Sequence, residues 1–273
     1  MTRLPHCDTL RLDLHGSTLF ITLNRPEVRN AMSLRMVAEL STVFTLIETD
    51  PAVRAVVLRG AGGHFCAGGD LHDMAEARGR PQEGGQPDPF HTLNRAFGRL
   101  LQQVNAAANI VVTVLEGTVM GGGLGLACVS DVALAGVQTR FALPETSLGV
   151  IPAQIAPFVV QRIGLTQARR LALLGITVDA HEARALGLVH QVAEGDAELD
   201  TQLQQVLARV RRCAPDATAR TKALLHRVGQ EPMADLLDDA AALFAQAMRG
   251  PEGAEGTLAF IQKRPPGWAE NDH

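Results

Sequence analysis

The chain has 273 residues, of which 46% are hydrophobic and 20% are charged, and its formal net charge is −4. This length allows one large domain with an appendage, or two domains, and the small negative charge gives no indication of a nucleic-acid-binding surface. No apolar run approaches the roughly 20 residues of a membrane-spanning helix, and the first residues lack the apolar stretch of a signal peptide. The sequence therefore predicts a cytoplasmic protein with a sizeable core that binds neither nucleic acid nor membranes.

The four cysteines, Cys7, Cys66, Cys128 and Cys213, are far apart in the sequence. They form no CxxC pair and no other spacing typical of metal ligands. We therefore expect free thiols in a reducing compartment and no metal centre.

The first half of the chain alternates strand and helix patterns. Residues 17–26 predict a strand that ends at Pro26, and residues 33–50 have apolar residues at helical spacing, with Ser33 as a candidate N-cap. Short apolar runs predict buried strands at 54–60, 108–117 and 131–136, and the pattern between them predicts a helix at 90–107. This alternation is typical of an α/β fold with buried sheets.

The remaining segments divide the chain. Residues 76–89 are rich in Gly, Pro and Gln and predict a long mobile loop. From about residue 155 the pattern is helical throughout, with segments at 166–175, 179–187, 198–214, 216–229 and 233–250. We therefore predict an α/β body at 1–195 and a helical region at 196–273.

Two glycine-rich turns follow two of the predicted strands, "GGHFCAGGDLHDM" after 54–60 and "MGGGLGL" after 108–117. Ligands of α/β proteins bind at the carboxyl ends of strands, and a helix N-terminus offers free N–H groups. Two such turns that converge would direct two donors at one oxygen. A glycine-rich turn alone is usually only a turn, and neither segment matches a dinucleotide-binding motif, a P-loop or a nucleophile elbow.

Four segments carry a resemblance to a known family: "ITLNRPEVRNAM", "HFCAGGDLHDM", "GGGLGLACVSDVALA" and "RFALPETSLGVIP". In order and spacing they resemble the signature blocks of the enoyl-CoA hydratase/isomerase (crotonase) family, and "FIQKRPPGW" is similar to its last block. The resemblance implies a spiral of ββα units followed by a helical trimerisation region. It also implies a trimer or a dimer of trimers, and a coenzyme A thioester as substrate with no bound prosthetic group.

The resemblance implies chemistry through a thioester enolate whose oxygen accepts two backbone N–H bonds. Matched to this sequence, the donors are Ala67 and Gly122, the middle glycine of the triplet. Fixed donors stabilise the charge that develops on this oxygen, and losing one costs on the order of 10²–10³ in rate. Glycine at 121–123 allows the backbone to approach a ligand closely.

The family's hydratases also use two glutamates. One position is Glu145, and the other is occupied here by Gly125, so this chain retains a single candidate acid/base. Read without the resemblance, Glu145 is a common type of residue at the start of a surface helix.

Coenzyme A requires cations for its phosphates and a loop along which the thioester lies. Arginine suits phosphate because its planar fork donates two hydrogen bonds, although any surface arginine would look the same. The candidate coenzyme A-binding residues are Arg25, Arg29, Ala67, Gly68, Gly69, Asp70, Leu71 and Lys263, with Arg264 beside the last of them. Asp70 is also suited to bracing its own loop through backbone hydrogen bonds.

Gly125, together with "LGVIPAQIAPFVVQRIG", is similar to the pattern of bacterial hydratases of 3-methylglutaconyl-CoA or isohexenylglutaconyl-CoA, which act in leucine or acyclic terpene breakdown. A substrate of this kind carries its own carboxylate, which a second glutamate would repel, and Gly125 would leave room for the 3-substituent. Gln154 is a candidate polar group of the substrate pocket, or an ordinary helix-cap residue. The alternatives are a Δ3-Δ2-enoyl-CoA isomerase, which works with one carboxylate, and a non-catalytic acyl-CoA-binding paralogue.

Overall fold

The computed structural model describes residues 4–79 and 88–270. Its centre is a six-stranded sheet in the order β1-β2-β3-β4-β6-β9, and a second sheet has the order β5-β7-β8. In the first sheet β1 and β2 are antiparallel and the other neighbours are parallel, whereas β7 and β8 of the second sheet are antiparallel. The strands are β1 (Leu10–His15), β2 (Thr18–Leu23), β3 (Ala55–Gly60), β4 (Ile110–Leu115), β5 (Thr118–Met120), β6 (Val132–Gly136), β7 (Arg140–Ala142), β8 (Thr177–Asp179) and β9 (Gln191–Ala193).

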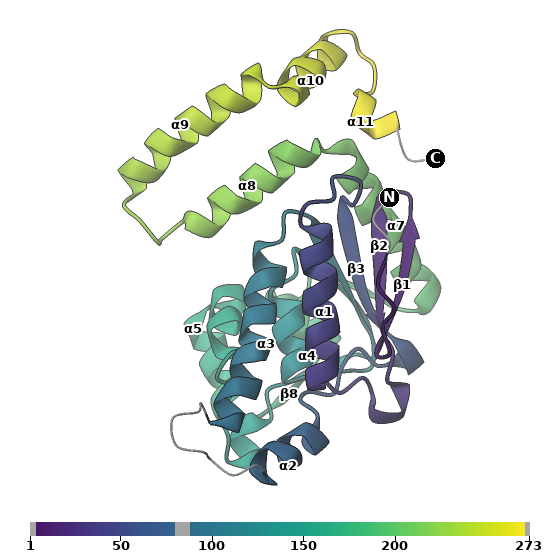
Figure 1. Ribbon diagram of the computed structural model, residues 1–273, viewed down its shortest axis with the longest axis vertical. Coiled ribbons are helices and arrows are strands. Elements are labelled where there is room, and N and C mark those ends of the chain that lie inside the picture. Colours follow the sequence, from purple (N-terminus) through teal and green to yellow (C-terminus); the bar gives the residue numbers. More distant parts are fainter. Residues whose placement is uncertain (1–3, 80–87, 271–273) are drawn as a thin grey trace.

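Helices cover the sheets and form the C-terminal part of the molecule (Figure 1). They are α1 (Leu34–Ile47), α2 (Leu71–Gly79), α3 (Pro89–Ala106), α4 (Gly122–Cys128), α5 (Ala156–Leu174), α6 (Ala180–Ala185), α7 (Asp196–Arg212), α8 (Pro215–Arg227), α9 (Met233–Arg249), α10 (Pro251–Ile261) and α11 (Gly267–Glu270). Three short 3-10 helices are η1 (Pro26–Val28), η2 (Ala61–Gly63) and η3 (Glu145–Leu148). The predicted helices 33–50 and 90–107 are confirmed as α1 and α3, and the side chain of Ser33 accepts the Met36 amide as an N-cap.

The inner strands are buried on both faces because their alternating side chains enter two different clusters. Val56 and Leu58 of β3 pack in the larger core with α1, α3 and α4, while Ala55 and Val57 face the other side. There they meet Leu199, Leu203 and Leu207 of α7. The predicted strands at 54–60, 108–117 and 131–136 are confirmed, and their continuous apolar pattern follows from this two-sided cover.

The chain winds as a spiral of strand–strand–helix units. β4 joins the six-stranded sheet, β5 the three-stranded one, and α4 follows; β6 and β7 repeat this division before η3 and α5. This arrangement confirms the predicted crotonase-like fold. It also places the segments that follow β3, β5 and β7 close together, since Cys66 bridges to Val119 and β5 pairs with β7.

The C-terminal helices α8, α9 and α10 extend away from the body (Figure 1). α7, the first helix of the predicted C-terminal region, covers a face of the sheet instead. Arg54, beside β3, donates to the carbonyl oxygens of Val210 and Arg211 at the end of α7. Carbonyls of a last helical turn lack partners within the helix, so this guanidinium ties α7 to the sheet.

Two sequence predictions were wrong in detail. The stretch after residue 155 is not helical throughout, because β8 completes the small sheet and β9 forms the edge of the large one. Both strands are three residues long, which is too short for an alternating pattern to stand out from the helical background. Of the predicted loop 76–89, residues 76–79 belong to α2 and Asp88 caps α3, while 80–87 lie outside the described residues.

Across the described ranges, no helix combines the length and apolar character that crossing a membrane requires. All four cysteines are free thiols, as the sequence predicts.

Candidate active site

The glycine-rich turns and Glu145 converge on one place. Gly121 has a φ of 49°, and a Cβ built on it would lie 2.8 Å from Oε1 of Glu145 and 3.4 Å from the Cα of Gly68. Only a glycine adopts this backbone without strain and leaves that space. Residues 68, 121 and 145 are far apart in the sequence and meet here because β5 pairs with β7 and Cys66 bridges to β5.

The triple glycine serves three purposes. Gly121 makes room for the Glu145 carboxylate, and Gly123 lets α4 approach the first turn, since a Cβ there would lie 2.7 Å from the Cβ of Cys66. Gly122 is the first residue of α4, where the amide lacks a partner within the helix. The side chains of Phe97 and Met32 lie beside it, and a Cβ at Gly122 would be 3.3 Å from the Phe97 ring.

Glu145 begins η3 directly after Pro144, and its carboxyl group is half-buried. Within the described part of the chain its Oε2 is buried and has no hydrogen-bond partner. Burial raises the pKa of this carboxyl above its ordinary value. A carboxylate with one unpaired, buried oxygen and a raised pKa is suited to accept and return a proton.

Ala67 is not the free donor that the sequence predicts. Its amide donates to the carbonyl oxygen of Arg29 at 3.0 Å. The amide of Met32 donates to the carbonyl oxygen of Gly68, and the amide of Asp70 donates to the carbonyl oxygen of Met32. In this parallel bridge the amide of Gly69 points away from Met32. Among the described residues, this Gly69 amide has no hydrogen-bond acceptor.

Gly125 does not leave the open space that the sequence predicts. The residue is fully buried, and a Cβ on it would lie 3.3 Å from side-chain atoms of both Leu101 and Ile155. These two apolar side chains fill the space beside Gly125. The position of the second glutamate has therefore become an apolar wall between α3 and the start of α5.

A model of the family described as enoyl-CoA hydratase/isomerase matches residues 14–271. The chain belongs to this family. It is accordingly an enzyme of the enoyl-CoA hydratase type that acts on acyl-CoA thioesters, as the sequence resemblance implies.

Several family members are similar over nearly the whole chain. A mevalonyl-coenzyme A hydratase of Aspergillus fumigatus is 33% identical, covering 92% of this chain and 90% of its own. The 2,3-dehydroadipyl-CoA hydratase of Escherichia coli is 30% identical, with 91% and 93% covered. Among solved structures, an enoyl-CoA hydratase/isomerase from Marinobacter aquaeolei is 68% identical with a TM-score of 0.94, and Pseudomonas aeruginosa AtuE is 56% identical with a TM-score of 0.92; each covers 96% of this chain and 100% of its own.

Arg25, one of the cations predicted to bind coenzyme A, is engaged within the protein itself. Its guanidinium forms an ion pair with Asp70 at 2.6 Å and donates to the carbonyl oxygen of Ala31. The other oxygen of Asp70 accepts the His72 amide at the start of α2. Burial raises the pKa of Asp70, but these hydrogen bonds outweigh burial and hold the pKa below its ordinary value. Asp70 therefore braces its loop, and Arg25, whose charge it neutralises, is not a free cation for a coenzyme A phosphate.

The other predicted cations are exposed. Arg29 lies on the surface beside the first turn, next to the carbonyl that binds Ala67. Lys263 follows α10, at the end of the molecule opposite α2 (Figure 1), while Arg264 is paired with Glu255. Arg29 therefore remains a local candidate for a phosphate, and Lys263 is one only for the active site of another chain.

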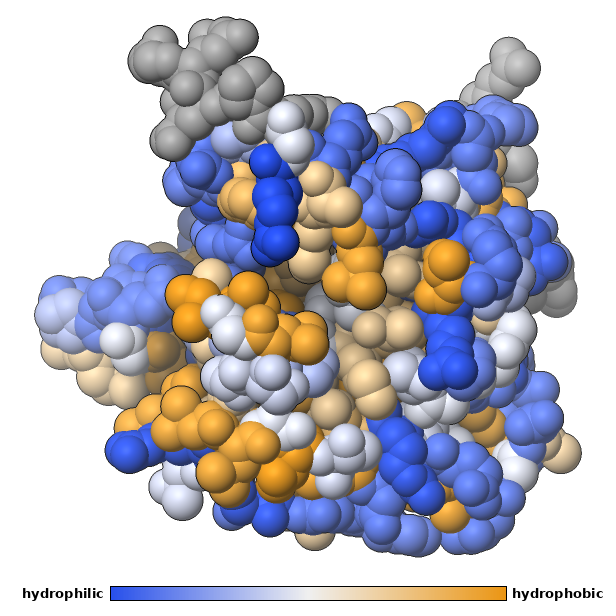
Figure 2. Space-filling view, turned by 90° about the horizontal axis from the view of Figure 1, so that it is seen from below, coloured by the Kyte–Doolittle hydropathy of each residue, from blue (hydrophilic) through white to orange (hydrophobic). Residues whose placement is uncertain are grey.

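The surface formed by α2 and the segment after Glu145 is apolar. Large side chains of α2 and of the segment after Glu145 are exposed, among them Leu71, Leu148 and Ile151. Figure 2 shows apolar side chains gathered on the underside of the molecule, the side on which α2 lies. The predicted coenzyme A-binding residue Leu71 is thus an exposed residue of this apolar surface.

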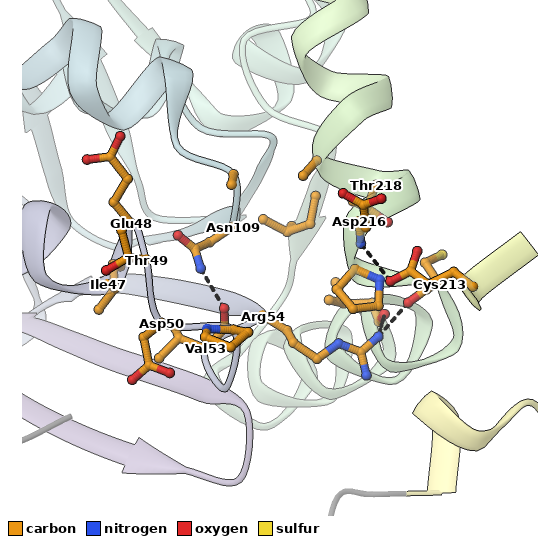
Figure 3. A pocket seen from close by; sticks show the side chains of 17 residues that line it. Ile47, Glu48, Thr49, Asp50, Val53, Arg54, Asn109, Cys213, Asp216 and Thr218 are labelled. Atoms are coloured by element: carbon orange, nitrogen blue, oxygen red, sulfur yellow. Dashed lines mark hydrogen bonds between the residues drawn. The ribbon is translucent and has the colours of Figure 1, made fainter. Parts of the chain in front are cut away.

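A pocket of about 320 Å³ lies elsewhere, where the C-terminal helices join the body (Figure 3). Its lining includes Arg54 and Asn109, which directly precede β3 and β4, Cys213, which follows α7, and Asp216 of α8. Asn109 donates to the carbonyl of Val53 within it. Neither glycine-rich turn nor Glu145 contributes to this pocket, so we assign it to the joint between the two parts of the chain.

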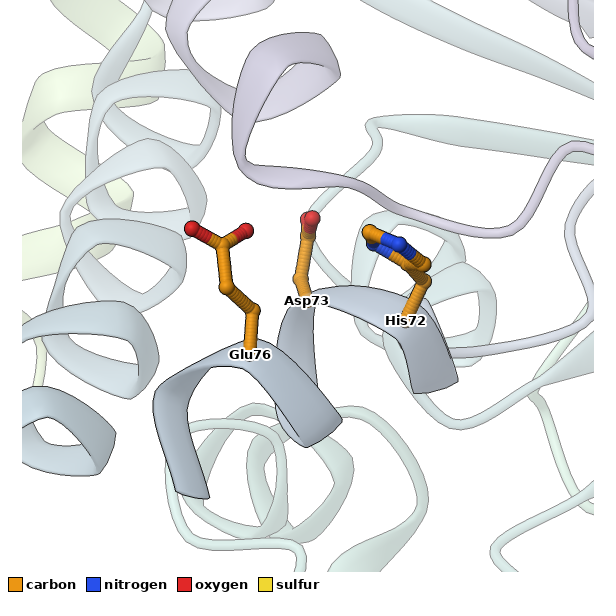
Figure 4. Close-up of side chains that lie close together, drawn as sticks. All are labelled: His72, Asp73 and Glu76. Atoms are coloured by element: carbon orange, nitrogen blue, oxygen red, sulfur yellow. The ribbon is translucent and has the colours of Figure 1, made fainter. Parts of the chain in front are cut away.

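The side chains of His72, Asp73 and Glu76 lie together on α2, with ligand atoms within 4.8 Å of one another (Figure 4). Their spacing did not indicate a metal site in the sequence. Asp73 already accepts the amide of Leu34 and so fixes α2 to the start of α1. We assign this exposed cluster no part in the site.

Sequence reasoning missed the partners that only packing supplies. Phe97 beside Gly122 and Leu101 beside Gly125 both come from α3, whose sequence shows only an amphipathic helix. The predicted pocket residue Gln154 lies against the same helix, where Arg95 donates to its Oε1 at 3.5 Å. Gln154 therefore does not act as a helix cap: its side chain crosses to α3, and among described residues no side-chain cap is seen at the start of α5.

Proposed function

We propose that the protein adds water across the double bond of a 3-branched glutaconyl-CoA, with Glu145 as the single acid/base. The observation that carries this proposal is the buried, unpaired Oε2 of Glu145, next to the two glycine-rich turns. The reaction needs no prosthetic group, because a carboxylate and backbone donors supply its proton transfer and its charge stabilisation.

The amides of Gly69 and Gly122 are the donors that we assign to the thioester oxygen. Gly69 replaces Ala67 in this role, because the Gly69 amide has no acceptor among the described residues, whereas the Ala67 amide donates to the carbonyl oxygen of Arg29. As water adds to the β-carbon, charge moves onto the thioester oxygen. Two fixed N–H groups stabilise that charge without reorganising during the reaction.

Glu145 then performs both proton transfers. Its carboxylate takes a proton from the attacking water while the new C–O bond forms at the β-carbon, and the carboxylic acid returns that proton to the α-carbon of the enolate. The addition is syn, because one group on one face of the substrate carries out both steps. The raised pKa of Glu145 suits a group that accepts and donates within one turnover.

The apolar wall at Gly125 supports a branched substrate that carries a carboxylate. A second glutamate at this position would add a like charge next to that carboxylate, whereas Leu101 and Ile155 keep this side of the site apolar. The names of two relatives point the same way: mevalonyl is a 3-branched acyl group, and 2,3-dehydroadipyl is a dicarboxylic one. Such a substrate belongs to leucine or acyclic terpene breakdown.

A panel of enoyl-CoA thioesters in ¹⁸O-labelled water tests this proposal. We expect the label in the product and a higher kcat/KM for 3-methylglutaconyl-CoA or isohexenylglutaconyl-CoA than for crotonyl-CoA. Faster hydration of crotonyl-CoA would refute the glutaconyl assignment. Double-bond migration without label would instead identify a Δ3-Δ2-enoyl-CoA isomerase, and binding without turnover across the panel would identify a non-catalytic acyl-CoA binder.

We also propose that the chain assembles with itself as a trimer or a dimer of trimers in the cytoplasm. Large apolar side chains of α9 and α10 are exposed in the single chain, including Phe244, Phe260 and Ile261. Lys263 lies two residues after α10, so a neighbour placed against these helices would also lie near this lysine.

A further inference from the structure

Arg95 is a half-buried arginine of α3 without a carboxylate partner in the described part of the chain. Its guanidinium donates to Oε1 of Gln102 at 2.7 Å and to Oε1 of Gln154 at 3.5 Å. Both acceptors are neutral amides. A guanidinium has five N–H groups, so most of its donors remain available.

Two other half-buried arginines are neutralised, and Arg162 of α5, which forms no ion pair among the described residues, donates instead to the carbonyl oxygens of Leu188 and Ser130. Arg25 is paired with Asp70, and Arg59 with Glu116 and Asp200. Half-buried cations are normally paired in this way because charge is costly to withdraw from water without an opposite charge. Arg95 departs from this pattern on a helix that lines the active site, which points to an anionic ligand.

Gly98 permits the contact between Arg95 and Gln154. A Cβ at Gly98 would lie 1.8 Å from Oε1 of Gln154, so any other residue would displace this side chain. Glycine in a helix interior costs about 1 kcal/mol relative to alanine. α3 therefore carries a destabilising residue where the amide of Gln154 has to approach.

The hydrogen bond from Arg95 also orients Gln154. Because Oε1 accepts it, the Nε2 group is the end that is left to donate, and no described residue accepts from it. The guanidinium and this amide group together present several N–H donors. A carboxylate accepts several such bonds, and arginine can bind it through two parallel ones.

The pair stands on the same two segments as the apolar wall. Gln154 is the neighbour of Ile155, and Gly98 is one helical turn from Leu101; Ile155 and Leu101 are the two residues that cover Gly125. The cation therefore belongs to the two segments, α3 and the start of α5, that border Gly125.

We infer that Arg95 and Gln154 form a subsite for the carboxylate at the far end of the acyl chain, which makes Arg95 the residue that selects dicarboxylic acyl-CoA substrates. This inference rests on the proposed hydratase function and adds to it the group that recognises the substrate's second charge.

The test compares Arg95→Gln with the wild type on 3-methylglutaconyl-CoA, on the methyl ester of its distal carboxylate and on crotonyl-CoA. Removing one partner of a charged hydrogen-bonded contact costs enough to lower kcat/KM for the free acid by about 30-fold or more. The values for the ester and for crotonyl-CoA should change less than about threefold. Gly98→Ala, which displaces Gln154, should give a smaller loss with the same selectivity.

Arg99→Gln is the matched control, since Arg99 is exposed and lies one turn further along α3. It should leave all three values unchanged, and circular dichroism confirms that each variant is folded. An equal loss on all substrates, or a loss in Arg99→Gln as large as in Arg95→Gln, would overturn the subsite. If wild-type protein hydrates no thioester at all, the proposed function fails, which is a different result from hydration without charge selectivity.

Discussion

At the scale of single residues, Glu145 carries the proton chemistry that we propose. Glu145→Gln keeps the size of the side chain and removes the base, so we expect turnover to fall by about 10² or more while acyl-CoA binding is retained. In the wild type, kcat/KM should fall as pH decreases through the raised pKa of Glu145, because the carboxylate then becomes protonated. Initial rates over pH and calorimetric binding of an acyl-CoA measure both effects; unchanged turnover would remove Glu145 from the mechanism.

The same carboxyl should destabilise the folded protein. A glutamate whose folded-state pKa is raised binds its proton more tightly when folded, so its ionisation lowers the free energy of unfolding as pH rises from its ordinary pKa through the raised one. Glu145→Gln should therefore have the higher Tm at neutral pH, and the difference should vanish below the ordinary pKa of glutamate. Thermal unfolding at pH 4 and pH 7.5 checks this; a lower Tm for the variant at pH 7.5 would contradict it.

Gly125 occupies the position of the second glutamate of the family's hydratases. Gly125→Glu would place a carboxylate between Leu101 and Ile155, so we expect a loss of about 2–4 kcal/mol in the free energy of unfolding and no gain in activity. Gly125→Ala is the control: better helix propensity offsets its tight contacts, and its change should stay within about 1 kcal/mol. Urea unfolding measures both variants. A Gly125→Glu protein that is stable and faster would show that the missing glutamate is only a defect.

At the scale of elements, Lys222 fixes α8 to the body. Its ammonium is buried and contacts Asp131 at 2.8 Å and the carbonyl of Asn109 at 3.2 Å, while Asp131 also accepts the Val111 amide. The basic residues of this chain are otherwise almost all arginine, with Lys263 the only other lysine. A compact ammonium suits this enclosed position better than a guanidinium fork.

Lys222→Met keeps the aliphatic length of the side chain and removes the charge. We expect it to cost about 1–3 kcal/mol, at the lower end because the Asp131 side chain is 24% exposed. Arg220→Gln on the same helix breaks an exposed pair with Asp216 and should change stability by less than about 1 kcal/mol. Urea unfolding separates the two, and equal losses would mean that burial of the pair is unimportant.

At the scale of the whole molecule, the proposed assembly predicts that the apolar face of α9 and α10 contacts another chain. Exposed apolar surface on this scale marks interaction sites, and Phe260 is 85% exposed. Multi-angle light scattering should find three or six chains per particle, and Phe260→Asp should lower that number. Ala254→Asp adds the same charge at an exposed small residue of α10 and should not. A monomeric wild type would refute the assembly.

The sequence by itself determined the class of fold, the buried strands at 54–60, 108–117 and 131–136 and the helices α1 and α3, and it indicated Gly122 and Glu145 as candidate site residues. These features depend on local pattern or on motifs that survive in the printed sequence, so no tertiary contact is needed to find them. The sequence did not predict the short strands β8 and β9, because three residues are too few to show the alternating pattern of a strand.

Only the tertiary structure decided which groups are free. Ala67 and Arg25 looked available in the sequence, but the first donates to Arg29 and the second binds Asp70, because the loops at 25–32 and 67–70 lie side by side. Gly125 suggested space, yet α3 and α5 fill it with Leu101 and Ile155. The sequence around Arg95 shows no unusual pattern, and only the folded chain shows that its hydrogen-bond partners are neutral amides. Each of these facts depends on contacts between residues distant in sequence, and only the packing of the folded chain creates them.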